Sequence, residues 1–595
     1  MTPTPSAVFR IHPANRIAAA VLAAGLVITG ILALLPALSK PFTLDETEIA
    51  YRAHYILEKG PKTFTDGSHY IAHPLLYEYS MAAVFRLFGE TEVPARAFGL
   101  ILFVIAGFLF KATLGELLRN EDPVLRTVAV YVGVLLYAVN PLLLQHALVL
   151  DADTTGTAVF TMAFAYFFVR MEMRDGVRQW PMRAAQAAAI ALAFLSKEIT
   201  PIFIFTGVLI YRAAGRQWKK LLEDTVGVFL PGVLAAWGIW WIYCACTGTD
   251  VMAFLKYTLI KKTGRAVNLH FLSRVFAGLG GIIRWPVYWM SAPFFVLLVV
   301  TFFRRTVSFF QTWKTRPEDA LWAVAFVVWI PYLLVKGSID MMKYQHPIYP
   351  LFMAAIVCGC VAAFRPRAED IGAALRDAWW IVPALAAVTV VTLWHYLRVG
   401  DYILFLWDTA DAPRYKHFLN LYYRPFVAAL GAAVVFWVLG RLKFTEGILA
   451  ASLLFCLPVN AALNLNQTAE YTTAESWMNY GEPGLKDTVE YLALITQPNA
   501  SVSVRDDVRY YLDIRKKLEG VNYVRVRDML LSRNLPLIDQ YFASGVMTAA
   551  VLDRISLMGL NAQNSGPQFA LFFRHYYLDR RIGDFKIYRP KRRLG

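Results

Sequence analysis

Long apolar segments separated by short polar loops run from residue 17 to about residue 464, and the remaining chain is more polar. A helix needs roughly 20 apolar residues to cross the hydrocarbon core of a bilayer, and this pattern predicts about thirteen spans. The predicted spans are residues 17–38, 97–117, 127–146, 154–170, 184–197, 200–212, 225–247, 282–303, 320–336, 346–363, 378–396, 425–440 and 447–464. The chain is therefore predicted to be a mostly α-helical, polytopic membrane protein.

One further apolar segment, residues 73–88, is short and carries Glu78 and Arg86. Charges on one side of a short apolar helix are typical of a helix that lies in the membrane interface. We therefore predict that this segment does not cross the membrane.

With that choice, every second loop is rich in lysine and arginine, as in the loop with Arg170, Arg174, Arg178 and Arg183. Cytoplasmic loops collect such residues, so these loops and the N-terminus are predicted to face the cytoplasm. Because the number of spans is odd, the C-terminal region is then predicted to lie on the extracytoplasmic side. The loops 39–96, 248–281 and 397–424 are predicted to lie on the same side. A bacterial plasma membrane is the expected location.

Residues 465–595 are predicted to form a small extracytoplasmic α/β domain, and residues 1–464 the transmembrane domain. Strand-like runs occur at 501–504, 546–552 and 585–588, and polar helical stretches at 507–518 and 526–533.

Composition narrows the class of protein further. The chain is 57% hydrophobic and only 17% charged, which is too apolar for a soluble core to hide. The net charge of +16 is spread over short loops and forms no single basic surface, so topology explains it better than a nucleic-acid partner. The five cysteines lie in apolar stretches and are interpreted as buried thiols.

Acidic residues mark the first two predicted outer loops. Asp45 and Glu46 follow the first span, and Asp151 and Asp153 precede the fourth. Asp153 or Thr154 could cap a helix, but Asp151 has no such duty. Two acidic sites at one membrane face suit a general base with a stabilising carboxylate, or a divalent-cation site, and the sequence leaves both open.

Basic residues are predicted at the same face, where they would suit a phosphate group. They are His73, Lys197, Lys261, Lys262, Arg265, His270, Lys343 and His346. A lysine at the membrane edge is costly, so Lys197 is expected to be functional, with Glu198 as a neighbouring partner, although snorkelling to the interface is the alternative. His346 equally suits a structural hydrogen bond, whereas Asp153 and His270 are candidates for a metal or acceptor site.

A phosphate at the membrane surface beside carboxylates suits a polyprenyl-phosphate sugar, because its tail lies in lipid while its polar head reacts outside. The predicted reaction is attack by an acceptor hydroxyl on the anomeric carbon, with lipid phosphate leaving. The acceptor is a lipid, a glycan or a protein.

The same residues resemble the integral-membrane C-type glycosyltransferases, in particular the protein O-mannosyltransferases and the bacterial aminoarabinose transferase of lipid A. The resemblance rests on LDETEIAYRAHYILEKG, HPLLYEYSMAAVFRLFGETEVPARAFG, LVLDADTTGTAVF, FLSKE and KYQHPIYPLF, in that order. It implies inversion at the anomeric carbon, with Asp45 as the catalytic base and Glu46 as its motif partner. It also implies that Asp151 is the acidic residue of the second loop and that Lys197 contacts the donor phosphate.

Two positions differ from the aminoarabinose transferases. His73 stands where they carry a lysine, and Glu48 replaces a basic residue. The resemblance therefore leaves the sugar undefined.

Two other hypotheses compete with a glycosyltransferase. A lipid or solute transporter should bury its charges near the midplane between broken helices in repeated halves, and the sequence shows no repeat. Alternatively, the C-terminal domain binds an envelope polymer and the transmembrane spans only anchor it. Thirteen spans are more than an anchor needs.

Overall fold

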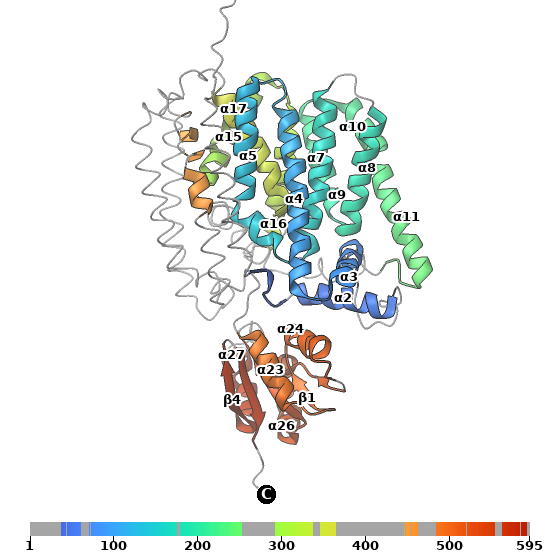
Figure 1. Ribbon diagram of the computed structural model, residues 1–595, viewed down its shortest axis with the longest axis vertical. Coiled ribbons are helices and arrows are strands. Elements are labelled where there is room, and N and C mark those ends of the chain that lie inside the picture. The colour runs from blue at the N-terminus through green and yellow to red at the C-terminus, as the bar shows by residue number, and fades with distance from the viewer. Residues whose placement is uncertain are drawn as a thin grey trace, which may run out of the picture.

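The protein is described by a computed structural model, which covers residues 37–42, 45–60, 71, 73–174, 179–252, 292–336, 346–364, 446, 448–450, 452–453, 455–461, 484–518, 520–553, 562–583 and 585–591. It contains a helical bundle and, at one end of that bundle, a small domain built around a sheet (Figure 1). The predicted mostly α-helical architecture with a small C-terminal α/β domain is confirmed. The predicted boundary at residues 464 and 465 lies outside the described residues.

The bundle is built from apolar helices joined by short turns. Its described helices are α2 (Asp45–Lys59), α3 (Leu76–Phe88), α4 (Glu92–Leu117), α5 (Pro123–Ala138), α6 (Pro141–Ala147), α7 (Thr157–Met173), α8 (Gln179–Ser196), α9 (Thr200–Ala214), α10 (Trp218–Asp224), α11 (Leu230–Thr247), α15 (Ala292–Thr312), α16 (Pro317–Lys336) and α17 (Tyr349–Phe364). Two π-helical turns, Ala152–Gly156 and Thr225–Phe229, precede α7 and α11.

Within the described part of the chain, four helical segments are long and apolar enough to cross a membrane: Glu92–Leu117, Trp218–Thr247, Pro293–Thr312 and His346–Phe364. In the last of these, 83% of the most apolar window is buried, against 28% for Trp218–Thr247. α17 therefore runs through the interior of the bundle, whereas α11 has an exposed apolar face that suits lipid. The predicted number of spans remains a prediction, because 17–38, 378–396 and 425–440 lie outside the described residues.

The predicted span 127–146 is two helices, α5 and α6. They meet at Asn140, which precedes Pro141, and the residue before a proline is disfavoured in the helical conformation. The Asn140 side chain instead accepts a hydrogen bond from the Leu143 N–H at 3.1 Å. A local break of this kind is invisible to a hydropathy average, because the flanking residues are all apolar.

The helices α2 and α3 lie at the end of the bundle that faces the C-terminal domain (Figure 1). Residues 73–88, predicted to lie in the interface, contain the short helix α3, and its last two residues, Leu87 and Phe88, are more than 70% exposed. That residues 73–88 lie in the membrane interface stays a prediction.

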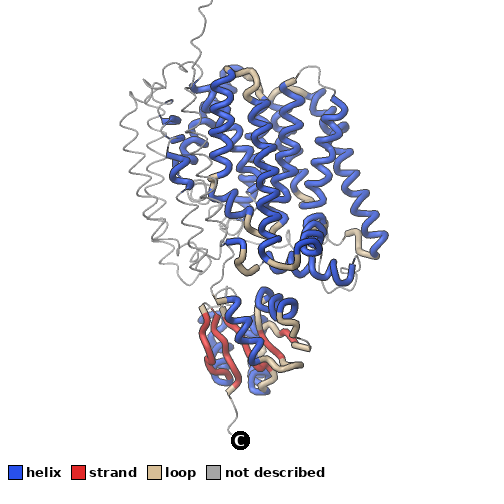
Figure 2. The backbone as a smooth tube through the Cα atoms, in the orientation of Figure 1, coloured by secondary structure: helices blue, strands red, loops and turns tan. Residues whose placement is uncertain are grey.

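The C-terminal domain holds a five-stranded sheet with helices packed beside it (Figure 2). Its strands are β1 (Ser501–Ser503), β2 (Asn522–Tyr523), β3 (Met547–Leu552), β4 (Tyr576–Ile582) and β5 (Phe585–Pro590), in the order β2-β1-β3-β5-β4. β1 is parallel to β2 and β3, whereas β5 is antiparallel to β3 and β4. The three predicted strands are present, and the sequence analysis missed β2 and β4.

The helices of this domain are α23 (Leu485–Ile495), α24 (Asp506–Tyr510), α25 (Val526–Leu531), α26 (Leu535–Ser544) and α27 (Ala562–His575), and the π-helical turn Tyr511–Arg515 continues α24. The predicted helix 507–518 corresponds to α24 and this turn, and 526–533 corresponds to α25. α24 faces the bundle (Figure 1).

Candidate active site

Glu46, the second residue of α2, is completely buried and paired with a completely buried arginine of α4. The two guanidinium nitrogens of Arg96 bind the two carboxylate oxygens of Glu46 at 2.7 and 3.2 Å. The Leu150 N–H donates to the same carboxylate at 3.0 Å. Because its oxygens are all engaged, Glu46 serves here as a positioning residue for the loops around it.

Arg96 also binds the backbone of both predicted outer loops. Its guanidinium donates to the carbonyls of Lys40 and Pro41, at 3.2 and 3.1 Å, and to the carbonyl of Leu148. A guanidinium carries five donors in a fixed fork, so one side chain can bind a carboxylate and several carbonyls together. The Glu46–Arg96 pair thereby ties segment 37–42 before Asp45 to segment 148–150 before Asp151.

Lys40 is 9% exposed and lies close to this guanidinium. Burial, and secondly the positive charge of Arg96, lower the pKa of Lys40 to about 7. The site therefore holds a lysine that gains or loses its charge near neutral pH.

The second outer loop continues into a kinked start of α7. Asp151 is 4% exposed, and its carbonyl accepts hydrogen bonds from the Thr154 N–H at 3.3 Å and from the Thr154 hydroxyl at 2.8 Å. Thr154 has φ −101° and ψ −108°, outside the helical region. Gly156 precedes α7, and no side-chain hydrogen bond caps the helix at this residue. The side chain of Asp153, one of the two predicted caps, lies outside the described residues.

Tyr77 of α3 connects the two outer loops through packing. A Cβ added to Gly156 would lie 3.1 Å from the Tyr77 ring, which is a tight contact that would make the ring shift by a few tenths of an ångström. Burial raises the pKa of Tyr77, and the negative charge of Asp151 raises it further. The phenol therefore stays protonated beside the Asp151 carboxylate.

Gly99 of α4 determines how closely the same loop approaches α4. A Cβ at this position would lie 2.2 Å from the carbonyl oxygen of Ala147, a distance that no side chain tolerates. The close approach brings the end of α6 against α4, one turn beyond Arg96. Glycine here is required for space, which sets the position of 148–150.

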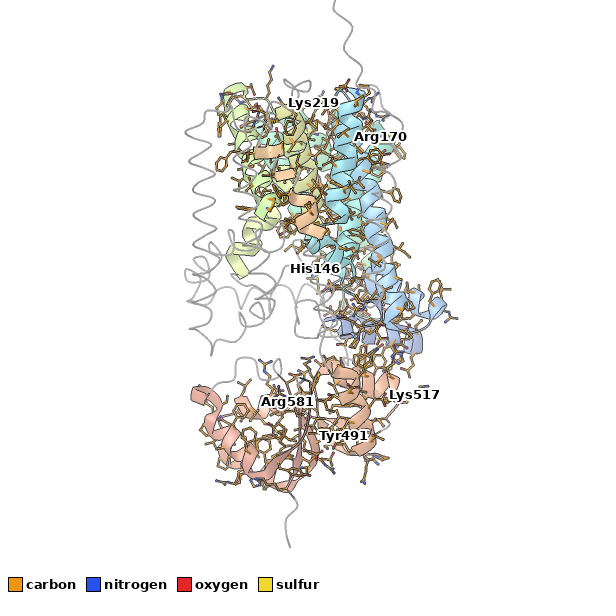
Figure 3. The ribbon with its side chains drawn as sticks, turned by 60° about the vertical axis from the view of Figure 1, so that its left-hand side comes forward. His146, Arg170, Lys219, Tyr491, Lys517 and Arg581 are labelled. Atoms are coloured by element: carbon orange, nitrogen blue, oxygen red, sulfur yellow. The ribbon has the colours of Figure 1, made fainter. Side chains whose placement is uncertain are left out.

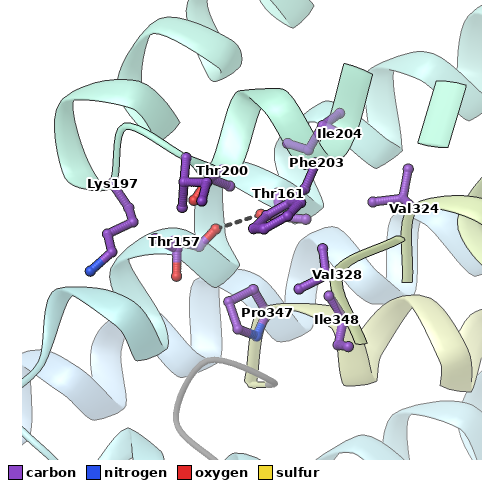
Figure 4. A pocket seen from close by; sticks show the side chains of 11 residues that line it. Thr157, Thr161, Lys197, Thr200, Phe203, Ile204, Val324, Val328, Pro347 and Ile348 are labelled. Atoms are coloured by element: carbon purple, nitrogen blue, oxygen red, sulfur yellow. Dashed lines mark hydrogen bonds between the residues drawn. The ribbon is translucent and has the colours of Figure 1, made fainter. Parts of the chain in front are cut away.

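Lys197 lies between α8 and α9, is 5% exposed, and lines a narrow cleft with about 410 Å³ of empty space including its mouth. The other lining residues are Thr157, Thr161, Ile199, Thr200, Phe203, Ile204, Val324, Val328, Pro347 and Ile348. Figure 4 shows Lys197 at one end of the cleft and the apolar side chains at the other. Burial of Lys197 within the bundle argues against the snorkelling alternative.

His346 is completely buried, and its Nε2 lies 3.2 Å from the carbonyl oxygen of Leu143. The ring of His146 is 6.4 Å away, and His146 itself is bonded to the Leu142 carbonyl. Of the two expectations for His346, this geometry favours the structural hydrogen bond, because the ring joins α6 to the start of α17.

His73 is 12% exposed at its side chain and lies beside a buried ion pair of α2 and α3. Arg52 and Glu78 are 3.0 Å apart, Arg52 also binds Glu48, and the His73 Nδ1 is 3.9 Å from Glu78. Burial raises the pKa of Glu78, while Arg52 opposes that shift. This cluster holds α2 on α3 and so supports the helix that begins with Asp45.

Several predicted site residues cannot be placed. The side chains of Asp45 and Asp153 lie outside the described residues, as do Arg265, His270 and Lys343. Among the residues that the structure describes, no group of three or more histidine, cysteine or acidic side chains has the geometry to hold a metal ion.

Arg96 and Tyr77 were not among the predicted site residues. Both lie in the longest of the motifs, HPLLYEYSMAAVFRLFGETEVPARAFG. An arginine at the start of an apolar helix is a usable signal, because a buried arginine needs a carboxylate partner. Nothing in the local pattern indicates that the partner is Glu46, which is 50 residues away.

Part of the chain matches a known protein family. Residues 72–243, which include α3, Arg96, Asp151 and Lys197, match the family model of the dolichyl-phosphate-mannose-protein mannosyltransferases. No curated protein matches the chain.

Among solved structures, the chain is similar to ArnT from Cupriavidus metallidurans. The crystal structure of ArnT bound to undecaprenyl phosphate has a TM-score of 0.55 at 14% identity, over 96% of this chain and 99% of that chain. The apo structure gives 0.52 at 13% identity, over 96% and 98%. The resemblance to integral-membrane C-type glycosyltransferases is confirmed by the family match and by the shared fold.

Proposed function

We propose that this protein transfers a sugar from a polyprenyl-phosphate-linked donor to a lipid, glycan or protein acceptor at the extracytoplasmic face of a bacterial plasma membrane. The observation that carries the proposal is the Glu46–Arg96 pair, which holds the two acid-bearing loops together inside the segment that matches a mannosyltransferase family. The undecaprenyl phosphate in the ArnT crystal structure supports a lipid-phosphate donor.

In this proposal, Asp45 removes the proton of the acceptor hydroxyl. The hydroxyl oxygen then bonds to the anomeric carbon as the bond from that carbon to the phosphate oxygen breaks, with inversion. A positioned general base contributes about 100- to 10,000-fold to such a step. Asp151 stabilises positive charge on the sugar, and Lys197 offsets the charge of the departing phosphate.

The chemistry of the Lys197 cleft supports this donor. Most of its lining side chains are apolar, as a prenyl chain requires, and the lysine at one end has the charge to attract a phosphate. Arg265, His270, Lys343 and His73 are the further basic candidates of the proposal, and Asp153 and His270 remain candidates for a metal or acceptor contact.

The positions of the loops also support the proposed orientation. Lys219 and Arg170, from loops predicted to be cytoplasmic, lie at the end of the bundle far from the C-terminal domain (Figure 3). The acid-bearing loops lie at the near end. This arrangement supports a cytoplasmic N-terminus and an external C-terminal domain.

The proposed base is tested by Asp45→Asn in purified protein with a radiolabelled polyprenyl-phosphate sugar. We expect transfer to fall at least about 100-fold with folding unchanged, because the amide cannot accept the proton. Glu58→Gln is the matched control, since Glu58 belongs to the same helix but is 57% exposed. Unchanged transfer by Asp45→Asn would refute the proposal, and movement of intact lipid without a new glycosidic bond would identify a transporter.

The outward orientation is tested by labelling a cysteine from outside the cell. Asp66→Cys is made together with Cys246→Ser, because Cys246 is the exposed native cysteine. Reaction with a membrane-impermeant maleimide is expected, and protection of residue 66 in intact cells would reverse the assigned side.

A further inference from the structure

The C-terminal domain touches the chain on both sides of Asp45. Tyr511, in the π-helical turn after α24, accepts a hydrogen bond from the Phe42 N–H at 2.6 Å. Its hydroxyl donates to the Glu92 carboxylate, also at 2.6 Å. Phe42 precedes Asp45 by three residues, and Glu92 is the first residue of α4.

Further polar contacts surround this one. Lys486 donates to the Ser39 carbonyl at 3.0 Å, and Arg515 binds Glu92 at 3.1 Å. Beyond Asp45, the Tyr51 hydroxyl donates to Asp513 at 3.0 Å. Segment 39–42 and helix α2 are therefore each attached to the C-terminal domain.

Aromatic side chains also pack between the C-terminal domain and the segment around Asp45. The Tyr510 ring lies edge-on to Phe42 at 6.0 Å and to Tyr51 at 5.1 Å. Tyr510 and Phe42 are fully buried. The two domains thus share a small continuous core, which a loosely tethered accessory domain would not have.

Tyr511 and Arg96 both form hydrogen bonds to the backbone of segment 40–42. Arg96 binds the carbonyls of Lys40 and Pro41 from the bundle, and Tyr511 binds the N–H of Phe42 from the C-terminal domain. Both side chains are anchored to α4, since Glu92 and Arg96 are one helical turn apart. Burial, and secondly Glu92, raise the pKa of Tyr511, so its hydroxyl keeps the proton that it donates.

We infer that Tyr511 is a positioning residue for the reaction, and that docking of the C-terminal domain through Tyr511 holds the backbone leading to Asp45 in its working place. The inference rests on the proposed function for its catalytic consequence only. The C-terminal domain is then a structural part of the active site and not an independent binding module.

The test uses the full-length protein with Tyr511→Phe, which keeps the ring and removes the hydroxyl. We expect kcat to fall about tenfold while KM for the polyprenyl-phosphate sugar stays the same, because one buried, charge-assisted hydrogen bond is lost and the donor site is intact. Hydrogen exchange of the amides in residues 39–52 should become faster, Phe42 first.

Tyr491→Phe is the matched control, because Tyr491 also donates to a carboxylate, that of Asp579, within the same domain. It should leave both kcat and exchange unchanged. If Tyr511→Phe does not fold, Glu92→Gln weakens the same hydrogen bond and should give the same pair of effects.

Unchanged exchange and unchanged kcat in Tyr511→Phe, with an inactive Asp45→Asn, would overturn this inference and leave the proposed function standing. An active Asp45→Asn would overturn the proposed function, whereas faster exchange in Tyr511→Phe would still establish the docking contact.

Discussion

Two completely buried arginines organise the two ends of the bundle in different ways. At the end far from the C-terminal domain, Arg212 of α9 binds Glu172 of α7 at 2.9 Å and Asp224 of α10 at 2.8 Å. At the near end, Arg96 binds Glu46 and three backbone carbonyls.

The difference lies in what each arginine connects. Arg212 joins helices through side chains, so its role is to hold the bundle together. Arg96 joins two loops that carry the candidate catalytic acids, so its role is to place them. The two arginines have the same charge and are equally buried, but their partners differ. We therefore expect loss of Arg212 to affect stability and loss of Arg96 to affect activity.

The largest effect on stability is expected for Arg212→Met. Removing one partner from a buried ion pair costs about 3–5 kcal/mol, because Asp224 stays buried without its partner and Glu172 keeps the exposed Lys220 as its ion-pair partner. Thermal unfolding in detergent should show the loss, and transfer per folded molecule should be unchanged. Lys220→Met is the control: Lys220 binds the same Glu172 but is 53% exposed, and surface pairs contribute about 0–1 kcal/mol.

Arg96→Met should affect activity most. We expect transfer per folded molecule to fall about 100-fold, the size of effect that a displaced catalytic group produces. Measurement on monodisperse protein separates this loss from misfolding. A variant with normal specific activity would remove the distinction between the two arginines.

Gly99→Ala sharpens the comparison by moving one loop without touching any charge. The added methyl would meet the Ala147 carbonyl, and overpacking of this kind costs about 1–3 kcal/mol. Transfer should decrease together with the unfolding temperature. Gly238→Ala on α11 has nothing within 4 Å of the new Cβ and should change neither quantity.

The last prediction concerns pH. Lys40 has a pKa of about 7 in the folded protein, against 10.5 for an ordinary lysine. Between these values the unfolded chain binds a proton that the folded protein does not, so stability should rise with pH from 7 to 10. Lys40→Met should flatten that rise in thermal unfolding measurements. An identical slope in both proteins would show that another group is responsible.

Local pattern was sufficient for the helices and for most of the small domain. The predicted span 97–117 lies within α4, and 200–212 lies within α9, because apolar runs of this length have few alternatives to a helix. Three strands of the sheet were predicted from strand-like runs of residues. β2 has only two residues, and β4 is polar along its exposed side, so neither carries that signal.

The sequence alone determined that this chain is a multi-helix membrane protein with a small C-terminal domain, and it identified Asp45, Glu46, Asp151 and Lys197 as the residues to examine. Only the tertiary structure decided that Glu46 is bound by Arg96, that Lys197 lines an apolar cleft, and that Tyr511 reaches Phe42. Apolar length and periodicity are local properties that any window of sequence displays. The Glu46–Arg96 and Phe42–Tyr511 contacts join residues that are 50 and 469 positions apart. Such contacts depend on how the helices pack, which a local sequence pattern does not predict.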